Sequence, residues 1–538
     1  MVSRIGNCLH GICTASPSNS FTRRINAPQA VGRRAAPDQR GCMRHGFLMK
    51  GGIVIALVAL FDRLFQFGFA GAGIGIFAGA WLLGLVAART DVRRTPHAWI
   101  AVASASLFVV ALLNDPGLLA WAMFWCALSV AALLPRSVKL DDAWHWIARL
   151  TIHAFAGIAK PFADLRRLCR RRKGARTNPR AVAATLALPL AGGALFLLLF
   201  AAANPLIEQA LASIRLPSPW RVLLWLFVAL CLWPSLRPHA VVMRLAARLP
   251  DPEPALPGTS LLSVLIALAL FNAIFAVQNG LDIAFLWSGG QLPAGMTQTE
   301  YVHRGAYPLI GTALIAGVMA LAMLRPHSAS EQHPWARRLV TLWVMQNLVL
   351  VASSALRTID YIESSMLTAW RIAALAWMAL VALGLVLICW RILKGLSARW
   401  LINWNALAST IVLAICTFVD LGAIASAWNV RAQTAQKIDL CYLHQVGDGA
   451  LNPLIALEQR PMDPTTRDRV RFVRERLLTD LEARQNTWAE WTPRGARRLA
   501  EAHAGLREHP VQPLPIAEPA WRGCDGSIQH PPAATSQP

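Results

Sequence analysis

The chain has 538 residues, of which 55% are hydrophobic and only 15% are charged. About a quarter of the residues in an ordinary soluble domain are charged, so this composition excludes such a domain and indicates a polytopic membrane protein. The net charge of +23 does not indicate nucleic-acid binding, because most of the excess lies in an N-terminal tail and in loops between apolar segments. Membrane proteins carry their orienting charges in such loops.

Residues 1–50 are polar, basic and rich in Arg, Ser and Pro. A secretory signal peptide has an apolar region soon after its positively charged start, and this segment contains no such region. We therefore expect residues 1–50 to be a disordered, basic tail on the cytoplasmic side.

Eleven segments after this tail are candidate membrane spans, which need about 20 mostly apolar residues. Four lie within residues 51–135 and seven within residues 181–428. Asp62 and Arg63 interrupt the first apolar run, which leaves a short or re-entrant segment open as an alternative. The sequence thus predicts an all-α, polytopic transmembrane bundle of about 11 spans. The spans begin near Gly51, Phe69, His97, Gly117, Ala181, Trp220, Leu261, Pro308, Leu339, Leu367 and Ala406.

The orientation of these spans follows from the distribution of Lys and Arg among alternate loops. One set of loops contains 24 of these residues and the opposite set contains 4. Cytoplasmic loops are the positively charged ones, so the N-terminus is predicted to be cytoplasmic and everything after Trp428 extracytoplasmic. The positive set comprises residues 89–96, 136–180, 237–259, 325–338 and 391–399. The opposite set comprises residues 62–68, 114–116, 204–219, 279–305 and 357–366.

Residues 136–180 form the most basic of the predicted cytoplasmic loops. Asp141 and Asp142 can cap a helix, and an arginine-rich run extends from Arg166 to Arg172. This pattern favours an interfacial helix lying on anionic lipid headgroups. The alternative is a connector packed on the bundle. The apolar positions at helical spacing are Ala143, Trp146, Ile147, Leu150, Ala154 and Ile158.

A polar hairpin over residues 278–307 separates two apolar runs. Thr297 and Glu300 have the spacing of a capping box, which predicts a helix start at Thr297. Tyr301 and Arg304 then share one face of that helix. The charge distribution places this hairpin on the outer side.

Further polar residues map to the same side of the membrane. A charged side chain in the hydrocarbon region costs several kcal/mol unless it is paired or reaches water. We expect Arg371 to pair with Glu363 or Asp360, and Asp420, placed inside the last span, to pair with an arginine. Each residue alone is better explained as an interhelical strut. As a set they predict a ligand-binding outer pocket formed by Tyr301, Arg304, Arg357, Tyr361, Arg371 and Asp420.

The C-terminal residues 429–538 are polar and contain no further span. Asp463 and Pro464 predict a helix start, after which Val470, Val473, Leu477 and Leu481 recur at helical spacing. A second helix is expected over residues 495–506, followed by a Pro-rich, disordered end. We therefore predict a small, extracytoplasmic α-helical region.

Two cysteines, Cys441 and Cys524, lie on the predicted outer side. An oxidising compartment permits them to form a disulfide, although two cysteines on one side can also coincide by chance. The four cysteines in apolar segments are small packing residues, and the spacing of Cys and His does not indicate a metal site.

Known catalytic motifs are absent from the sequence. It contains no phosphate-binding loop, nucleophile elbow or HExxH zinc motif, so kinase, ATPase, hydrolase and zinc-protease classes lack support. No cofactor or metal is predicted. A membrane enzyme would need an acid or base, for which Asp282 and Glu300 are the outer-loop candidates.

The segment Glu300–Tyr307 (EYVHRGAY) resembles the "eYaRrGf" signature of a bacterial membrane family, domain of unknown function 4173, which is related to domain of unknown function 4153. The pattern Arg357-x-x-x-Tyr361 followed by Leu367-Thr368-x-x-Arg371 resembles its next element. Here Met366 replaces an expected glycine.

The end of the resemblance lies in the C-terminal region. Asn429-Val430-x-Ala432, Asp439-Leu440-x-Tyr442-Leu443 and Asp448-Gly449-Ala450 are similar to the family's closing stretch, although Gly449 enlarges the last spacing. The resemblance covers residues 261–456. It implies a multi-pass protein of the bacterial inner membrane and implies no activity.

Two functions are consistent with this pattern. In the first, the outer pocket binds or handles a small or lipid-linked ligand of the cell envelope. In the second, the protein is a non-catalytic membrane sensor or assembly partner that acts through its outer C-terminal region. Apart from the lipid bilayer, the sequence specifies no partner.

Overall fold

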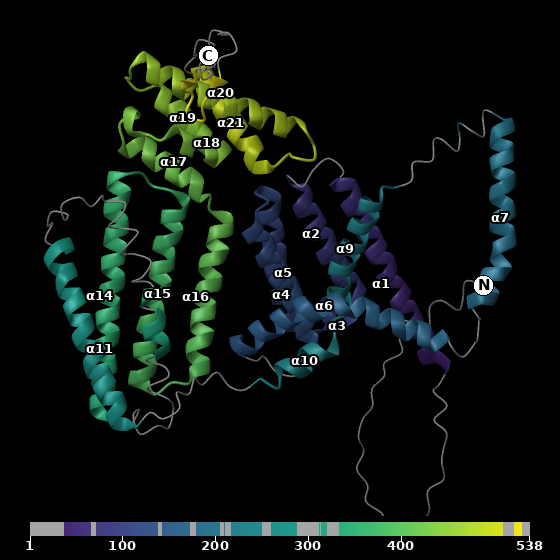
Figure 1. Ribbon diagram of the computed structural model, residues 1–538, viewed down its shortest axis with the longest axis horizontal. Helices are drawn as coiled ribbons and strands as arrows, with labels where there is room; N and C mark the ends of the chain where they lie inside the picture. The colour runs from purple at the N-terminus through teal and green to yellow at the C-terminus, as the bar shows by residue number, and fades with distance from the viewer. Residues whose placement is uncertain are drawn as a thin grey trace, which may run out of the picture. The chain divides into compact units, whose positions relative to one another are not determined.

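The computed structural model describes residues 37–65, 71–137, 142–172, 179–204, 209, 217–249, 260–287, 311–312, 314–319, 333–508 and 521–529 (Figure 1). Residues 1–48 and residues 49–538 are separate units. The described chain is helical except for one antiparallel pair of short strands, β1 (Trp521–Arg522) and β2 (Ile528–Gln529). The expected all-α polytopic fold is confirmed.

One apolar core is built by helices of the N-terminal half. It contains a cluster of aromatic side chains: Phe77 contacts Phe61, and Trp81 contacts Phe124 edge-on, with ring centroids 5.4 and 6.0 Å apart. At Gly75 an added Cβ would lie 2.6 Å from Leu113, so glycine allows the two helices there to approach closely. The helices are α1 (Pro37–Leu64), α2 (Gly73–Ala88), α3 (Thr90–Arg94), α4 (Pro96–Asn114), α5 (Leu118–Leu133) with the 3-10 turn η2 (Leu134–Arg136), and α9 (Pro219–Leu236).

The charged interruption in the first apolar run has a structural partner. Both carboxylate oxygens of Asp62 accept hydrogen bonds from Arg221 at 2.6 Å, and Trp225 Nε1 donates to the same carboxylate at 2.8 Å. Asp62 therefore joins α1 to α9.

Helix α6 (Ala143–Arg172) packs against α9 and the short helix α10 (Ala240–Ala246). It turns its polar residues inward and its apolar residues outward, the reverse of a water-facing amphipathic helix. Its buried polar residues are Arg149, His153, Lys160 and Asp164. Its exposed apolar residues are Ile147, Phe155, Ile158 and Phe162.

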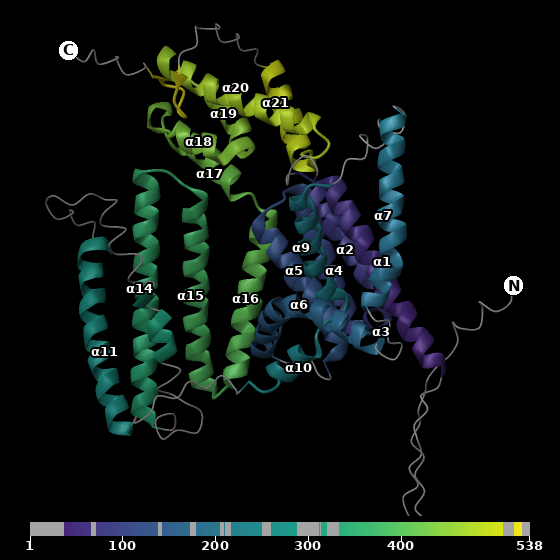
Figure 2. The same ribbon diagram turned by 45° about the vertical axis from the view of Figure 1, so that its right-hand side comes forward.

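A second group of long helices runs side by side in the order α11, α14, α15 and α16 (Figure 1 and Figure 2). Asn272, Asn279 and Gln346 form a polar seam between the first two, with Gln346 Nε2 donating to Asn272 Oδ1 at 3.1 Å. The bounds are α11 (Leu261–Asp282), continued by the π-helical turn η3 (Ile283–Trp287), α14 (Pro334–Ser364), α15 (Ala369–Lys394) and α16 (Ala398–Phe418).

Within the described ranges, seven helices are long and apolar enough to cross a membrane, whereas the sequence predicted about 11 spans. Helix α2 and the apolar part of α7 (Pro179–Ala203) are shorter, and α1 is interrupted by Asp62. The segment near Pro308 lies mostly outside the described residues. The seven are α4, α5 with η2, α9, α11, α14, α15 and α16.

The last span differs from its prediction. Helix α16 begins at Ala398 rather than near Ala406, and it ends at Phe418. Asp420 therefore does not lie inside a span, as the sequence suggested, but is the N-cap of the next helix, α17 (Leu421–Ala432). Its carboxylate accepts a hydrogen bond from the backbone of Ala423 at 2.9 Å, which is the geometry of a helix N-cap.

The C-terminal helices share a core of their own, which includes Leu443, Leu454, Val473 and Ala502. The two helices predicted here are confirmed as α20 and α21, and all four apolar residues of the first are buried. The elements are α17, η4 (Ala435–Lys437), α18 (Leu440–Val446), η5 (Gly447–Ala450), α19 (Leu451–Glu458), α20 (Pro464–Asn486) and α21 (Pro493–Glu508).

Cys441 at the start of α18 is bonded to Cys524 in the turn between β1 and β2. Their Cα atoms are 4.9 Å apart, and 83 positions separate them in sequence. The bond ties the strand pair to the C-terminal helices. Arg469 and Arg522 add ion pairs to Asp525 and Asp468 in the same place.

Candidate functional site

The six residues predicted to form one outer pocket do not converge in the described part of the chain. Tyr301 and Arg304, together with the capping box at Thr297 and Glu300, lie outside the described residues. The other four fall into three separate places.

Arg357 is buried between α14 and α11, where it forms an ion pair with Asp282. Arg357 and Asp282 are only 6% and 3% exposed. Gln278 Nε2 also donates a hydrogen bond to Asp282 Oδ1 at 3.1 Å. Arg357 thus joins two helices through a carboxylate. Asp282, a predicted acid of the enzyme alternative, is engaged by the same pair.

Arg371 and Tyr361 meet at the turn between α14 and α15. The guanidinium carbon of Arg371 lies 3.9 Å from the ring centroid of Tyr361, and Nη1 donates to the carbonyl of Met366. The predicted ion pair of Arg371 with Asp360 or Glu363 is not formed among the described residues. Arg371 lies in the first turn of α15, and its guanidinium extends back to the preceding turn, where it contacts the Tyr361 ring and the Met366 carbonyl.

The same turn is held by residues of the C-terminal half. Asn429 is fully buried, and its side-chain amide makes two hydrogen bonds with the backbone of Leu367, at 2.7 and 2.8 Å. The hydroxyl of Tyr442 accepts from the backbone of Ala369 at 2.9 Å, and Gln433 donates to the carbonyl of Ser365 at 3.0 Å. Two separated motifs quoted for the family resemblance therefore contact each other here.

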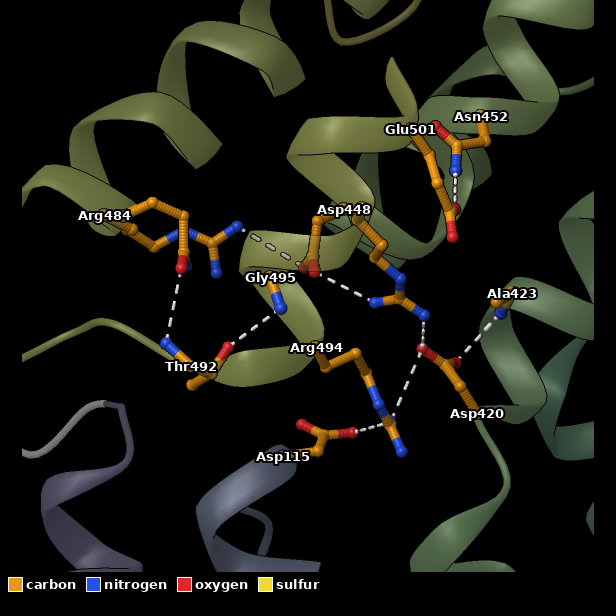
Figure 3. A network of polar contacts seen from close by, with 12 residues as sticks. Asp115, Asp420, Ala423, Asp448, Asn452, Arg484, Thr492, Arg494, Gly495 and Glu501 are labelled. Atoms are coloured by element: carbon orange, nitrogen blue, oxygen red, sulfur yellow. Dashed lines mark hydrogen bonds and ion pairs between the residues drawn. The ribbon is translucent and has the colours of Figure 1, made fainter. Parts of the chain in front are cut away.

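Asp420 belongs to a network of carboxylates and arginines, drawn in Figure 3. Arg498 of α21 bridges two carboxylates: its Nη2 lies 2.5 Å from Asp420 Oδ2 and its Nη1 lies 2.9 Å from Asp448 Oδ2. Arg484 of α20 also reaches Asp448, at 3.4 Å. The predicted pairing of Asp420 with an arginine is present, and the arginine comes from the C-terminal region.

Arg494, one helical turn before Arg498, links the network to the spans. Its Nη1 lies 2.5 Å from Oδ2 of Asp115 at the end of α4 and 3.9 Å from Asp420. Its Nη2 donates to the carbonyl of Phe418, the last residue of α16, at 2.9 Å. The backbone of Ala72 adds a hydrogen bond to the carbonyl of Trp491 at 2.9 Å. The C-terminal helices thus contact the ends of two spans through charged groups.

These side chains line a polar cleft of about 400 Å³. Such a volume lies within the range of small-ligand pockets, about 300–1,000 Å³. Gly71 closes one edge in a left-handed conformation (φ 77°), and a Cβ there would lie 2.5 Å from the Ala489 carbonyl. The lining comprises Gly71, Asn114, Asp115, Pro116, Asp420, Val446, Asp448, Arg484, Gln485, Glu490, Thr492, Arg494 and Arg498.

The acids of the cleft differ in how they titrate. Burial acts to raise the pKa of Asp420, but the hydrogen bonds from Arg498 and from the Ala423 backbone outweigh it and hold this pKa below the usual 3.8. Burial raises the pKa of Asp115, against the pull of Arg494 and with the help of the neighbouring Asp420. The network therefore stabilises the ionised form of Asp420 more than that of Asp115.

The arginines of this cleft were missed from the sequence. One signal was available: Arg494 stands in the first turn of α21, where the helix dipole disfavours a cation. A cation in that position indicates a nearby carboxylate. The acids involved are far away in sequence, Asp115 by 379 positions, so periodicity could not identify them.

Within the described ranges, groups of three or more His, Cys, Asp or Glu side chains with metal-binding geometry are absent. The cleft offers arginines to an anion and carboxylates to a cation or a hydroxyl. The cleft can therefore bind a polar or charged ligand through hydrogen bonds and ion pairs.

The long apolar helices and the polar contacts between them define an α-helical integral membrane protein. The chain belongs to the family described as domain of unknown function 4153 (DUF4153), whose model matches residues 99–457. No curated protein and no solved structure matches the chain. The family match includes Asp115, Asp420 and Asp448 but ends before Arg484, Arg494 and Arg498.

Proposed function

We propose that this membrane protein binds or handles a small or lipid-linked ligand of the cell envelope in the polar cleft beside Asp420. The proposal includes a location in the bacterial inner membrane, with the N-terminus cytoplasmic and the C-terminal helices outside, as the loop charges predict. It also includes the finer kinship with domain of unknown function 4173.

The observation that carries this proposal is the pairing of arginines with carboxylates around an open, polar volume. Arg498 contributes both Nη groups to Asp420 and Asp448, the fork that also suits a phosphate or carboxylate of a ligand. An anionic ligand would compete with these acids and loosen the contact between α21 and the spans. Binding would thereby change the position of the C-terminal helices.

The remaining predicted residues have supporting roles in this proposal. Arg357 with Asp282, and Arg371 with Tyr361, hold the helices and the turn on which α17 and α18 rest. Tyr301 and Arg304 of the 278–307 hairpin remain proposed ligand contacts. The lipid-facing role of residues 136–180 also remains a proposal, supported by the exposed Phe155 and Phe162.

The test uses the purified full chain in lipid nanodiscs, with inorganic phosphate and a polyprenyl phosphate as two separate probes. We expect either probe to raise the unfolding temperature, and Arg498→Ala to abolish the increase. Arg497→Ala is the matched control, because Arg497 is a neighbouring, exposed arginine without an ion pair among the described residues. An equal response of both variants would contradict ligand binding in this cleft.

The predicted six-residue pocket has its own test. Arg304→Ala and Arg371→Ala should each weaken probe binding in a folded protein. If both variants bind with full affinity, these residues do not contribute to the site.

The sensor or assembly function is supported by a different observation. Each arginine of the cleft already has a carboxylate partner, so the network can act solely as a clamp between the C-terminal helices and the spans. Deletion of residues 460–538 does not separate the two functions, because it removes α20 and α21 and thus the arginines of the cleft.

A charge exchange separates the functions. The double variant Asp420→Arg with Arg498→Asp restores an ion pair but displaces the arginine that would bind a ligand. The measurement is whether each variant, expressed in cells that lack the native protein, restores the cellular function lost with it. Recovery of that function in the double variant, after its loss in each single variant, would favour the clamp. Continued loss in a stably folded double variant would favour ligand binding.

A further inference from the structure

A second hollow lies among the N-terminal helices and is almost entirely apolar. It consists of two adjoining cavities, of about 660 and 380 Å³, that share Trp81, Trp125, Phe227 and Cys231. Helices α2, α5 and α9 form most of the walls, and α6 closes the second cavity. We call the two together the apolar chamber.

The chamber has one polar end. There the lining includes Ser129, His153 and Ser235. The hydroxyl of Ser235 is already used, because it accepts from Trp81 Nε1 at 2.9 Å and donates to the carbonyl of Leu232 at 2.7 Å. His153 is only 3% exposed, and its Nδ1 has no hydrogen-bond partner in the described part of the chain.

A buried polar atom without a partner is costly, and such atoms are rare in folded proteins. The ring of His153 is held in place by stacking on Trp125, with centroids 6.2 Å apart. The ring of His153 therefore has a defined position in the wall at this end of the apolar volume. A ligand with a polar head and an apolar body satisfies both features.

The charged groups around the polar end of the chamber determine which charge of a ligand head group is favoured there. Burial, together with the positive charges of Arg89 and Arg136, lowers the pKa of His153 to about 4, so the imidazole is neutral at physiological pH. A neutral imidazole can donate one hydrogen bond from Nδ1. The Arg89 guanidinium pairs with Asp91 on one side, and its Nη1 lies 3.3 Å from the carbonyl of Ser235 at this end of the chamber, where it favours an acceptor with negative charge. A carboxylate or phosphate suits this end, whereas a cationic head does not.

The chamber is open towards the surface of the spans. Leu118 and Phe227 belong to its lining and are 86% and 63% exposed. They lie on α5 and α9, two of the helices that are apolar enough to cross a membrane. A ligand in the bilayer can thus enter sideways without crossing water.

We propose that the apolar chamber binds a long-chain amphiphile with an anionic head, whose alkyl chain fills the apolar part and whose head accepts a hydrogen bond from Nδ1 of His153. A free fatty acid and an anionic phospholipid share this chemistry. The chamber borders the polar cleft at Pro116, which lines both, but its walls are apolar, and its occupancy does not depend on the function proposed above.

The experiment uses the purified full chain in nanodiscs of phosphatidylcholine and a photoreactive C16 fatty acid carrying a diazirine in its chain. We expect crosslinks on α5 and α9. Cys231→Trp enlarges a side chain that lines both cavities and should reduce these crosslinks at least tenfold. Cys389→Trp is the matched control, because Cys389 lies in α15, away from the chamber, and should leave them unchanged.

The head is tested with a C16 trimethylammonium probe of the same chain length. The wild type should crosslink the carboxylate probe about tenfold more than the cationic one. His153→Phe keeps a ring against Trp125 and should lose this preference while retaining crosslinks to the chain. Competition with phosphatidylglycerol or with unlabelled fatty acid then shows which of these two lipids displaces the probe more effectively.

Two results would overturn the proposal. Equal labelling of the Cys231→Trp and Cys389→Trp variants would exclude the chamber as the place of the alkyl chain. An unchanged head preference in His153→Phe would exclude His153 as the partner of the head.

Discussion

Several buried or half-buried charged side chains in the described part of the chain pair with opposite charges. Asp62 joins Arg221 across two helices, and Arg474 joins Glu458 within the C-terminal core. Lys160 and Asp164, both buried, pair on one helix. A buried charge without a partner is strongly destabilising, so the loss of one member of such a pair should cost more than the loss of both.

The Arg357–Asp282 pair provides the clearest test of this effect. Arg357→Met leaves the Asp282 carboxylate buried without its cation and should lower the free energy of unfolding by about 3–5 kcal/mol. The double variant with Asp282→Asn should recover most of that loss. Unfolding in detergent, followed by intrinsic fluorescence, measures both.

Arg371→Met serves as the comparison for this pair. The Arg371 guanidinium faces a ring and a carbonyl, so its loss should cost about 0.5–2 kcal/mol. If Arg357→Met lowers the free energy of unfolding no more than Arg371→Met does, the ion pair does not stabilise the protein as predicted.

Asp420 predicts a pH dependence of the clamp between α21 and the spans. Its pKa in the folded protein lies below the usual 3.8, so its contribution to stability is present above about pH 4 and is lost as the pH falls through the folded pKa. The unfolding temperature of the C-terminal helices should therefore fall with acidification, and Asp420→Asn should remove part of this dependence.

A second capping aspartate controls for the general effect of acid. Asp439 caps α18 in the same way as Asp420 caps α17, but it has no arginine partner among the described residues. Asp439→Asn removes a helix cap without an ion pair, so it separates the loss of a cap from the loss of the Asp420–Arg498 pair. Identical pH profiles for all three proteins would refute the contribution of the Asp420–Arg498 pair.

At the level of elements, local residue patterns predict where a helix starts, whereas tertiary partners determine which of its faces is buried. The Asp463 cap and the apolar spacing after it led to the correct assignment of α20, since both are properties of neighbouring residues. Helix α6 shows the opposite case. Its amphipathic pattern is visible in the sequence, but the face that is buried depends on α9 and α10, which receive its polar residues.

The disulfide between Cys441 and Cys524 should stabilise the C-terminal region. It closes a loop of 83 positions, for which loop-closure entropy predicts about 4.6 kcal/mol, and measured losses of native disulfides are about 2–5 kcal/mol. Cys441→Ser with Cys524→Ser should lower the unfolding free energy of the C-terminal helices by this amount, whereas Cys389→Ser should have little effect.

The oxidation state of the pair is measured directly. The peptide masses of protein purified without reductant should show Cys441 joined to Cys524. Free thiols at both positions in such protein would contradict an oxidising location for the C-terminal region.

At the level of the whole molecule, the distribution of charge predicts the orientation. With the positive loops inside, an introduced cysteine at Arg497 in α21 should react with a membrane-impermeant maleimide on intact cells. One at Arg94 in α3 should react only after permeabilisation. Both are made in a variant without free native cysteines. The reverse pattern would invert the predicted topology.

The sequence by itself determined the class of fold, the approximate positions of most spans and the starts of several helices. These follow from runs of apolar residues and from capping residues, which are local. It also pointed to Asp420 and Arg371 as residues that need partners. It could not name those partners, because the cost of a charge in an apolar segment says nothing about which distant group relieves it.

The tertiary structure alone decided which charges meet. It divided the predicted outer pocket into an Arg357–Asp282 pair, an Arg371–Tyr361 stack and an Asp420 network. It brought Arg494 to Asp115 across 379 positions and enclosed the apolar chamber. Helix packing sets these contacts, and no local pattern of residues encodes it.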